Sequence, residues 1–248
     1  MQILEKYRKK FPLIATILFG VALVALAPQL LLLLIGLIEM LFDGRIRFMT
    51  IISQLTLFVN WGLNGIVPAA FLVYALLSLK KGGNRHRLAI CGGVALAQLL
   101  LTPVISFVRY LAFGGNFEWS VGYLFDLLPT NVLPYLLFAA IIVFSLKWMD
   151  SPVVPAVVAA LITCVFLNAL WGGVVSLLQT VVNFFFQRLD FWETCKILIS
   201  SLSSCVYGIA FHGGLLLLVP LALCEKAPAD GAPAEETPAE ESPDSNDE

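Results

Sequence analysis

Residues 153–224 read VVPAVVAALITCVFLNALWGGVVSLLQTVVNFFFQRLDFWETCKILISSLSSCVYGIAFHGGLLLLVPLALC. Two long apolar runs in this stretch are separated by a short polar segment, residues 187–193. With a rise of about 1.5 Å per residue, each run is long enough to cross the ~30 Å hydrocarbon core of a bilayer as a helix. The stretch therefore predicts a transmembrane helical hairpin that closes near Asp190.

Two glycine pairs stand at matched positions in this hairpin, Gly172-Gly173 in the first run and Gly213-Gly214 in the second. A turn near Asp190 brings the two pairs to within about one and a half helical turns of each other. Small residues allow membrane helices to approach closely. We therefore predict that Gly172, Gly173, Gly213 and Gly214 are helix-packing positions.

The composition of the whole chain agrees with a membrane protein. Of its 248 residues, 59% are hydrophobic and 13% are charged, whereas a soluble domain carries about 25% charged residues. Further apolar runs precede the hairpin, at residues 11–42, 48–79, 88–113 and 131–148. Together with the hairpin they predict an all-α, polytopic membrane helix bundle of six transmembrane spans, formed by residues 11–224.

The basic residues predict how this bundle is oriented. Ten of the 15 Lys and Arg residues fall on one side of a six-span chain, and five fall on the other. The richer side includes an N-terminal arm, residues 1–10, and the segment KKGGNRHR at residues 80–87, which has the composition of a flexible basic loop. Because positive residues favour the cytoplasm, both termini are predicted to be cytoplasmic. The expected location is a bacterial cytoplasmic membrane.

The C-terminal segment differs sharply from the rest of the chain. Residues 225–248 are rich in Ala, Pro and Glu and carry a net charge of −8, whereas residues 1–224 carry +6. A segment of this composition cannot bury enough apolar surface to offset the entropy lost on ordering. It is predicted to be a disordered cytoplasmic tail.

Four polar residues within or beside the apolar runs are the candidates for a substrate-binding cavity: Asn64, Asn131, Asn168 and His212. Polar groups in membrane spans frequently mark solute pathways, and broken helices of transporters expose carbonyls to such a site. The alternative is structural, because interhelical Asn bonds are common in helix bundles. For His212 it is a neutral imidazole that bonds within the bundle.

Two acidic residues, Glu39 and Asp126, lie nearest the hydrocarbon, close to the outer ends of their runs. Their carboxylates are expected to reach interfacial water or to pair with nearby arginines. The arginines considered are Arg45, Arg47 and Arg109. A contact with a solute or a cation is the alternative.

The sequence contains no G-x-S-x-G, H-E-x-x-H or Walker-type glycine loop, so no enzyme activity, cofactor or metal is expected. Its five cysteines include no C-x-x-C pair. In size and span count only, without a shared motif, the chain resembles small-solute permeases and the substrate-binding membrane subunits of importers.

These features make a small-solute transport component the leading functional hypothesis. A non-catalytic scaffold or accessory subunit is the first alternative, and an intramembrane enzyme built on His212 is the remote one. The expected partners are the lipid bilayer and either another membrane subunit or a small solute, without nucleic acid.

Overall fold

The structure, a computed structural model, describes residues 10–42, 48–112, 132–146, 151, 153–186 and 191–224. Almost all of these residues are helical, and none of them forms a strand. The helices are α2 (Lys10–Phe42), α3 (Phe48–Lys81), α4 (Arg85–Ala112), α6 (Val132–Leu146), α7 (Val153–Phe186) and α8 (Phe191–Cys224). The predicted all-α helix bundle is confirmed. The N-terminal arm before Lys10 and the acidic tail lie outside the described residues.

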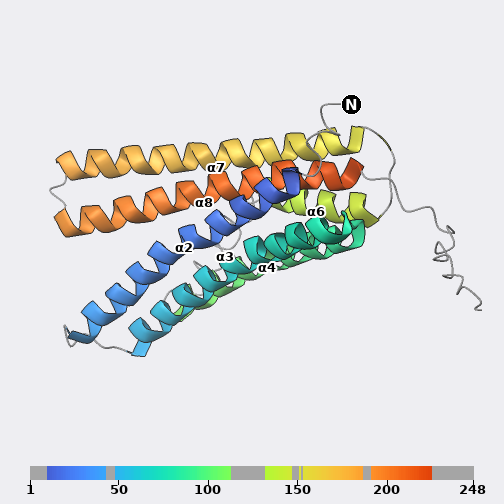
Figure 1. The fold of residues 1–248 in the computed structure, drawn as a ribbon. Helices are drawn as coiled ribbons and strands as arrows, with labels where there is room; N and C mark the ends of the chain where they lie inside the picture. Colours follow the sequence, from blue (N-terminus) through green and yellow to red (C-terminus); the bar gives the residue numbers. More distant parts are fainter. Residues whose placement is uncertain are drawn as a thin grey trace, which may run out of the picture.

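The six helices pack in a closed ring. Around the ring the order is α7, α8, α2, α3, α4 and α6, and α6 returns to contact α7. The first and last of the described helices, α2 and α8, are thus neighbours, and they run in opposite directions (Figure 1). Helix α2 begins and helix α8 ends at the same end of the bundle, as an even number of crossings requires.

The bundle is tight at one end and splayed at the other. All six helices converge near the start of α2 and the end of α8, whereas the α7–α8 hairpin and the α2–α3 pair diverge toward their far ends (Figure 1). Proline lies inside several of these helices without ending them, at Pro28, Pro68, Pro103 and Pro220.

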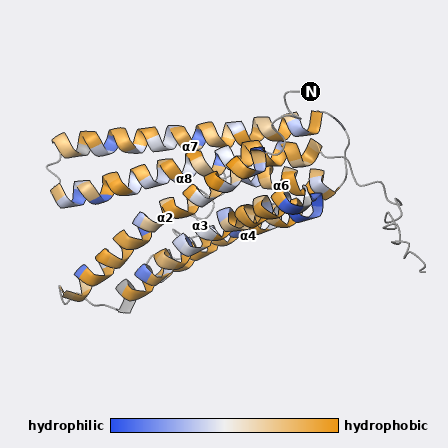
Figure 2. Cartoon of the chain, in the orientation of Figure 1, coloured by the Kyte–Doolittle hydropathy of each residue, from blue (hydrophilic) through white to orange (hydrophobic). Residues whose placement is uncertain are grey.

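The outer surface of the bundle is apolar. Large side chains such as Val24, Trp171 and Phe185 are 72%, 69% and 72% exposed. Apolar residues cover the helices along most of their length, and hydrophilic ones gather at the turn between α3 and α4 (Figure 2). A surface of this kind is strongly disfavoured in water and suits hydrocarbon. The chain is a multi-pass membrane protein.

Within the described residues, five helices are long and apolar enough to cross a membrane: α2, α3, α4, α7 and α8. Helix α6 is apolar but has only 15 residues, which corresponds to about 22 Å of helix. The fourth span was expected over residues 131–148, and the ends of that range lie outside the described residues.

Phenylalanines from four helices form the centre of the core. Phe19 of α2 stacks on Phe71 of α3 with ring centroids 5.7 Å apart, and it lies 6.0 Å from Phe211 of α8. Phe71 also lies 6.1 Å from Phe211 and 6.4 Å from Phe138 of α6. Offset and edge-on ring contacts of this kind stabilise a core beyond area burial alone. This phenylalanine cluster joins α2, α3, α6 and α8 at the tight end of the bundle.

Residues 80–87 were predicted to form a flexible basic loop, and this was wrong for all of them except residues 82–84, because the others belong to helices. Only three residues, 82–84, separate α3 from α4. Gly82 has φ of +77°, a left-handed conformation that glycine adopts without strain. The side-chain oxygen of Asn84 accepts hydrogen bonds from the backbone N–H groups of His86 and Arg87, at 2.9 and 3.3 Å. Asn84 is therefore the N-cap that starts α4.

Arg85, counted as a loop residue from the sequence, is buried at 4% exposure. Its Nη2 donates a 2.6 Å hydrogen bond to the backbone carbonyl of Leu223. The last carbonyls of a helix have no partner within the helix. Arg85 supplies one to the last turn of α8 and so fixes the α3–α4 turn against the end of that helix.

Candidate functional site

A cavity of about 350 Å³ lies between α7 and α8. Helix α7 contributes Ala169, Leu170, Gly172, Gly173 and Ser176 to its wall, and α8 contributes Ser204, Cys205, Tyr207, Gly208, Ile209 and His212. Its volume falls near the lower end of the range for small-molecule sites. The wall combines an apolar surface with a few hydroxyl, thiol and imidazole groups.

Small residues at helical spacing create this space. On α7, Ala169, Gly172 or Gly173, and Ser176 recur every three to four residues, so they share one face of the helix. A Cβ atom on Gly172 would meet nothing within 4 Å, whereas a Cβ atom on Gly173 would lie 2.7 Å from the Sγ atom of Cys205. Gly173 therefore sets the distance between the two helices, and Gly172 keeps the cavity open.

His212 presents one ring nitrogen for recognition. Its Nδ1 lies 2.8 Å from the backbone carbonyl oxygen of Gly208, one turn earlier in α8. A carbonyl only accepts, so Nδ1 carries the proton, and Nε2 of the neutral ring bears a lone pair. The rings of Phe166 and Phe211 lie 6.1 and 5.4 Å from the imidazole and hold its plane. His212, one of the lining residues, thus carries one hydrogen-bond acceptor on its ring, Nε2.

Hydroxyl groups extend the polar lining toward the neighbouring helices. The hydroxyls of Ser176 and Ser201 are 3.3 Å apart across the α7–α8 contact. Ser204 accepts a 2.7 Å hydrogen bond from Nε2 of Gln29 on α2. The Tyr207 hydroxyl donates to the backbone carbonyl of Asn64 on α3, at 3.4 Å. The last two bonds connect the wall of the cavity to α2 and α3.

Among the four residues predicted to line one cavity, the structure places His212 alone in the α7–α8 wall. The side chain of Asn64 instead accepts a 2.7 Å hydrogen bond from Gln98 of α4. Asn168 is exposed on α7 and is not among the residues that line the cavity. Asn131 lies outside the described residues.

The four glycines predicted to pack helices serve different contacts. Gly173 faces Cys205 in the α7–α8 contact, but Gly214 faces Phe19 of α2, where an added Cβ would lie 2.8 Å from the ring. Gly213 has an ordinary 3.5 Å approach to Leu18 of α2, and Gly172 faces open space. The second pair therefore packs against α2, not against the first pair.

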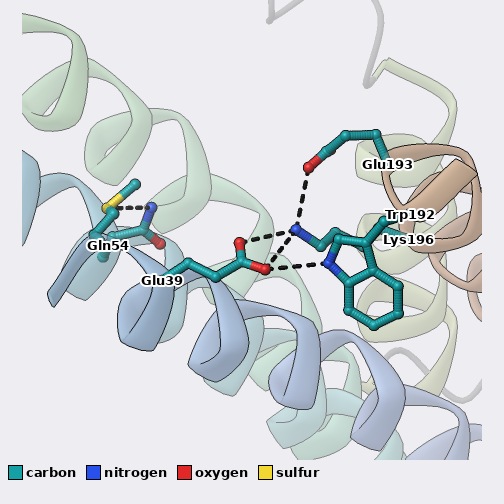
Figure 3. Close-up of polar contacts among 6 residues, drawn as sticks. Glu39, Gln54, Trp192, Glu193 and Lys196 are labelled. Carbon is teal, nitrogen blue, oxygen red and sulfur yellow. Dashed lines mark hydrogen bonds and ion pairs between the residues drawn. The ribbon is translucent and has the colours of Figure 1, made fainter. Parts of the chain in front are cut away.

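A charged cluster joins the far ends of α2 and α8 (Figure 3). Lys196 Nζ lies 2.8 Å from one carboxylate oxygen of Glu39 and 3.1 Å from Glu193. Trp192 Nε1 donates to Glu39 at 3.2 Å, and the Lys196 ammonium lies 5.4 Å from the Trp192 ring centroid. We call these four residues the outer cluster.

The outer cluster supplies the partner of Glu39 that the sequence did not identify. This carboxylate was expected to reach interfacial water or to pair with an arginine, and the structure places Lys196 against it. Arg45, Arg47 and Asp126, together with the side chain of Arg109, lie outside the described residues.

The spacing of small and polar residues in the sequence also predicts this cavity. On α8, Ser201, Ser204, Gly208 and His212 are spaced by three or four residues, which places small and polar residues on a single helical face. Opposite them, α7 carries a matching stripe of small residues. Two such stripes in adjacent spans predict a close contact with polar lining, independently of any single conspicuous residue.

In the described part of the chain, no group of three or more His, Cys, Asp or Glu side chains could hold a metal ion. Comparison with known proteins adds no assignment, since no family model, no curated protein and no solved structure matches this chain. The chemistry of the cavity must therefore be argued from its own residues.

Proposed function

We propose that this membrane protein is a small-solute transport component whose α7–α8 cavity holds the solute. The observation that carries the proposal is a cavity of about 350 Å³ with hydrogen-bonding groups on otherwise apolar walls. Solute sites in membrane bundles have this composition, because a few polar groups fix the solute and apolar walls exclude other water-soluble molecules.

The groups on the wall favour a neutral solute that is partly apolar. The Nε2 atom of His212 accepts a hydrogen bond, and the hydroxyls of Ser176 and Ser204 can donate or accept. No aspartate, glutamate, lysine or arginine is among the residues that line the cavity. A charged solute would therefore lose its hydration without gaining an ionic partner.

We also propose that both termini face the cytoplasm of a bacterial cell. The distribution of Lys and Arg supports this orientation, and it places the α3–α4 turn and the converged helix ends on the cytoplasmic side. The outer cluster then lies at the opposite surface, at the splayed end of the bundle.

Cysteine accessibility tests whether solutes reach the cavity. Cys205 lines it, whereas Cys164 is exposed on the surface of α7 and is not a lining residue. Two variants that each retain one of these cysteines would be treated in proteoliposomes with a water-soluble thiol reagent. We expect modification of Cys205 and little of Cys164, because thiolate formation requires water and Cys164 faces lipid. A panel of sugars, nucleosides and amino acids would then be screened for protection of Cys205.

A scaffold or accessory subunit is the second candidate, and one observation favours it. Several polar side chains pair with each other, as Gln98 does with Asn64 and Gln29 does with Ser204. Polar groups that satisfy one another hold a bundle together and leave fewer for a solute. The same experiment separates the two candidates, since a scaffold predicts that Cys205 reacts as slowly as Cys164.

We do not extend the proposal to catalysis. The proton on Nδ1 of His212 is directed to the carbonyl of Gly208 on its own helix, and no carboxylate is among the lining residues to orient or charge the imidazole. A histidine general base is normally supported by such a group on its second nitrogen.

A further inference from the structure

A second groove, of about 650 Å³, runs between α2 and α8 and does not share its lining with the α7–α8 cavity. Its apolar walls include Ile17, Val21, Val24, Pro28, Ile199 and Val206. Ser203 also borders the groove, but its hydroxyl donates to the backbone carbonyl of Ala25. The groove therefore presents hydrocarbon to whatever occupies it.

The two faces that form the groove continue outward to the outer cluster. On α2, Glu39 follows Pro28 by eleven residues, which is about three helical turns and returns to the same face. On α8, Lys196 precedes Ile199 by three residues, and residues at this spacing are neighbours on one face. The ion pair between Glu39 and Lys196 therefore joins α2 and α8 beyond the outer end of the groove, about one helical turn past Ile199 and three turns past Pro28.

The length of the groove suits one lipid chain. From Ile17 to Pro28 the groove extends over eleven residues of α2, or about 16 Å, which is close to half of a ~30 Å hydrocarbon core. Both helices cross the membrane, so the molecules beside the groove are lipids. An acyl chain is the occupant that fills an apolar groove without leaving a void or an unpaired polar group.

The outer cluster indicates the headgroup. It holds two carboxylates, one ammonium and one indole, a net charge of −1. Carboxylates bind a primary ammonium through charge-assisted hydrogen bonds, and an ammonium such as that of Lys196 binds phosphate oxygens. The ring of Trp192 is suited to the interface and attracts cations. A headgroup with both a phosphate and a primary ammonium matches this set of charges.

We propose that the α2–α8 groove is a lipid site. It holds one acyl chain of a phospholipid whose headgroup carries a phosphate and a primary ammonium, and this headgroup lies at the outer cluster. The site differs from the α7–α8 cavity in its helices, its chemistry and its ligand. It does not depend on the transport activity proposed above.

Photo-crosslinking with phosphatidylethanolamine tests the site. Proteoliposomes would contain a small fraction of this lipid with a photoreactive group in one acyl chain, and crosslinked residues would be located by mass spectrometry. Gly20→Leu introduces a side chain at a lining position of the groove, where an added Cβ meets nothing within 4 Å. Gly36→Leu is the matched control, because Gly36 is also open, lies on the same helix and is not a lining residue.

We expect crosslinks on the groove residues of α2 and α8, a several-fold loss in Gly20→Leu and no loss in Gly36→Leu. Unlabelled phosphatidylethanolamine should compete better than phosphatidylglycerol, and a Glu39→Gln, Glu193→Gln double variant should reduce that difference. Crosslinks spread evenly over all outward helix faces would indicate ordinary surrounding lipid and overturn the proposal. So would equal competition by the two lipids with the parent protein, or an unchanged signal in Gly20→Leu.

Discussion

Gly214→Ala should weaken the tight end of the bundle. An added Cβ would lie 2.8 Å from Cε1 and 2.9 Å from Cζ of Phe19, whereas carbon atoms in contact prefer about 3.5–4.0 Å. The ring would therefore have to move by roughly 0.7–1 Å. Phe19 is fully buried and lies against Phe71 and Phe211, so its movement displaces the whole phenylalanine cluster. Overpacking of this kind costs about 1–3 kcal/mol.

Gly172→Ala provides the matched control for this prediction. Its Cβ would meet nothing within 4 Å. Both substitutions gain about 1 kcal/mol of helix propensity, so the difference between the two variants isolates the steric cost. Unfolding in mixed micelles by increasing sodium dodecyl sulfate, followed by circular dichroism, should place Gly214→Ala below Gly172→Ala by about 1–3 kcal/mol. Equal unfolding free energies would show that Phe19 does not hold Gly214 at close range.

Three further outcomes are expected. Gly173→Ala should lower the unfolding temperature, and Cys205→Ala in the same chain should restore it, because the new methyl collides only with that sulfur; absence of rescue would assign the loss to another contact. Arg85→Leu should cost about 1–3 kcal/mol in the same unfolding assay, since a buried carbonyl at the end of α8 loses its donor; parent-like stability would mean that water replaces the guanidinium. A reporter fused after Glu248 should read as cytoplasmic and one inserted at residues 114–116 as external, and finding both on one side would reject the six-span topology.

The extents of the helices were largely readable from the sequence. The apolar run at residues 11–42 became Lys10–Phe42, and the run at residues 48–79 became Phe48–Lys81. In hydrocarbon, every backbone polar group must be bonded within its own helix, so the length of an apolar run is nearly the length of a helix. The N-cap at Asn84 was also available in the sequence, but the surrounding basic residues and glycines suggested a loop.

The sequence did not show which helices pack against each other. Arg85 and Leu223 are 138 residues apart in the chain, and nothing in either segment identifies the other. Lipid-facing and buried faces are both apolar in these helices, so no amphipathic pattern shows which side of a helix packs inward. His212 could be selected as a candidate from its residue type alone. The partner of Asn64 and the surroundings of His212 could not be predicted, because they depend on which helix faces meet.

Because the helices converge at one end, a small rotation of a helix about that end produces a large displacement at its other end. With the phenylalanine cluster as the pivot, the part of α8 between Phe211 and Phe191 extends about 30 Å from it. A rotation of α8 by about 10° at this pivot would move its first residues by roughly 5 Å, which is about the rise of one helical turn. Rearrangements too small to break the core would therefore change the width of the α2–α8 groove at its mouth. The ion pair between Glu39 and Lys196 lies far from this pivot, so a given force between its two side chains exerts a large torque on α8 relative to α2.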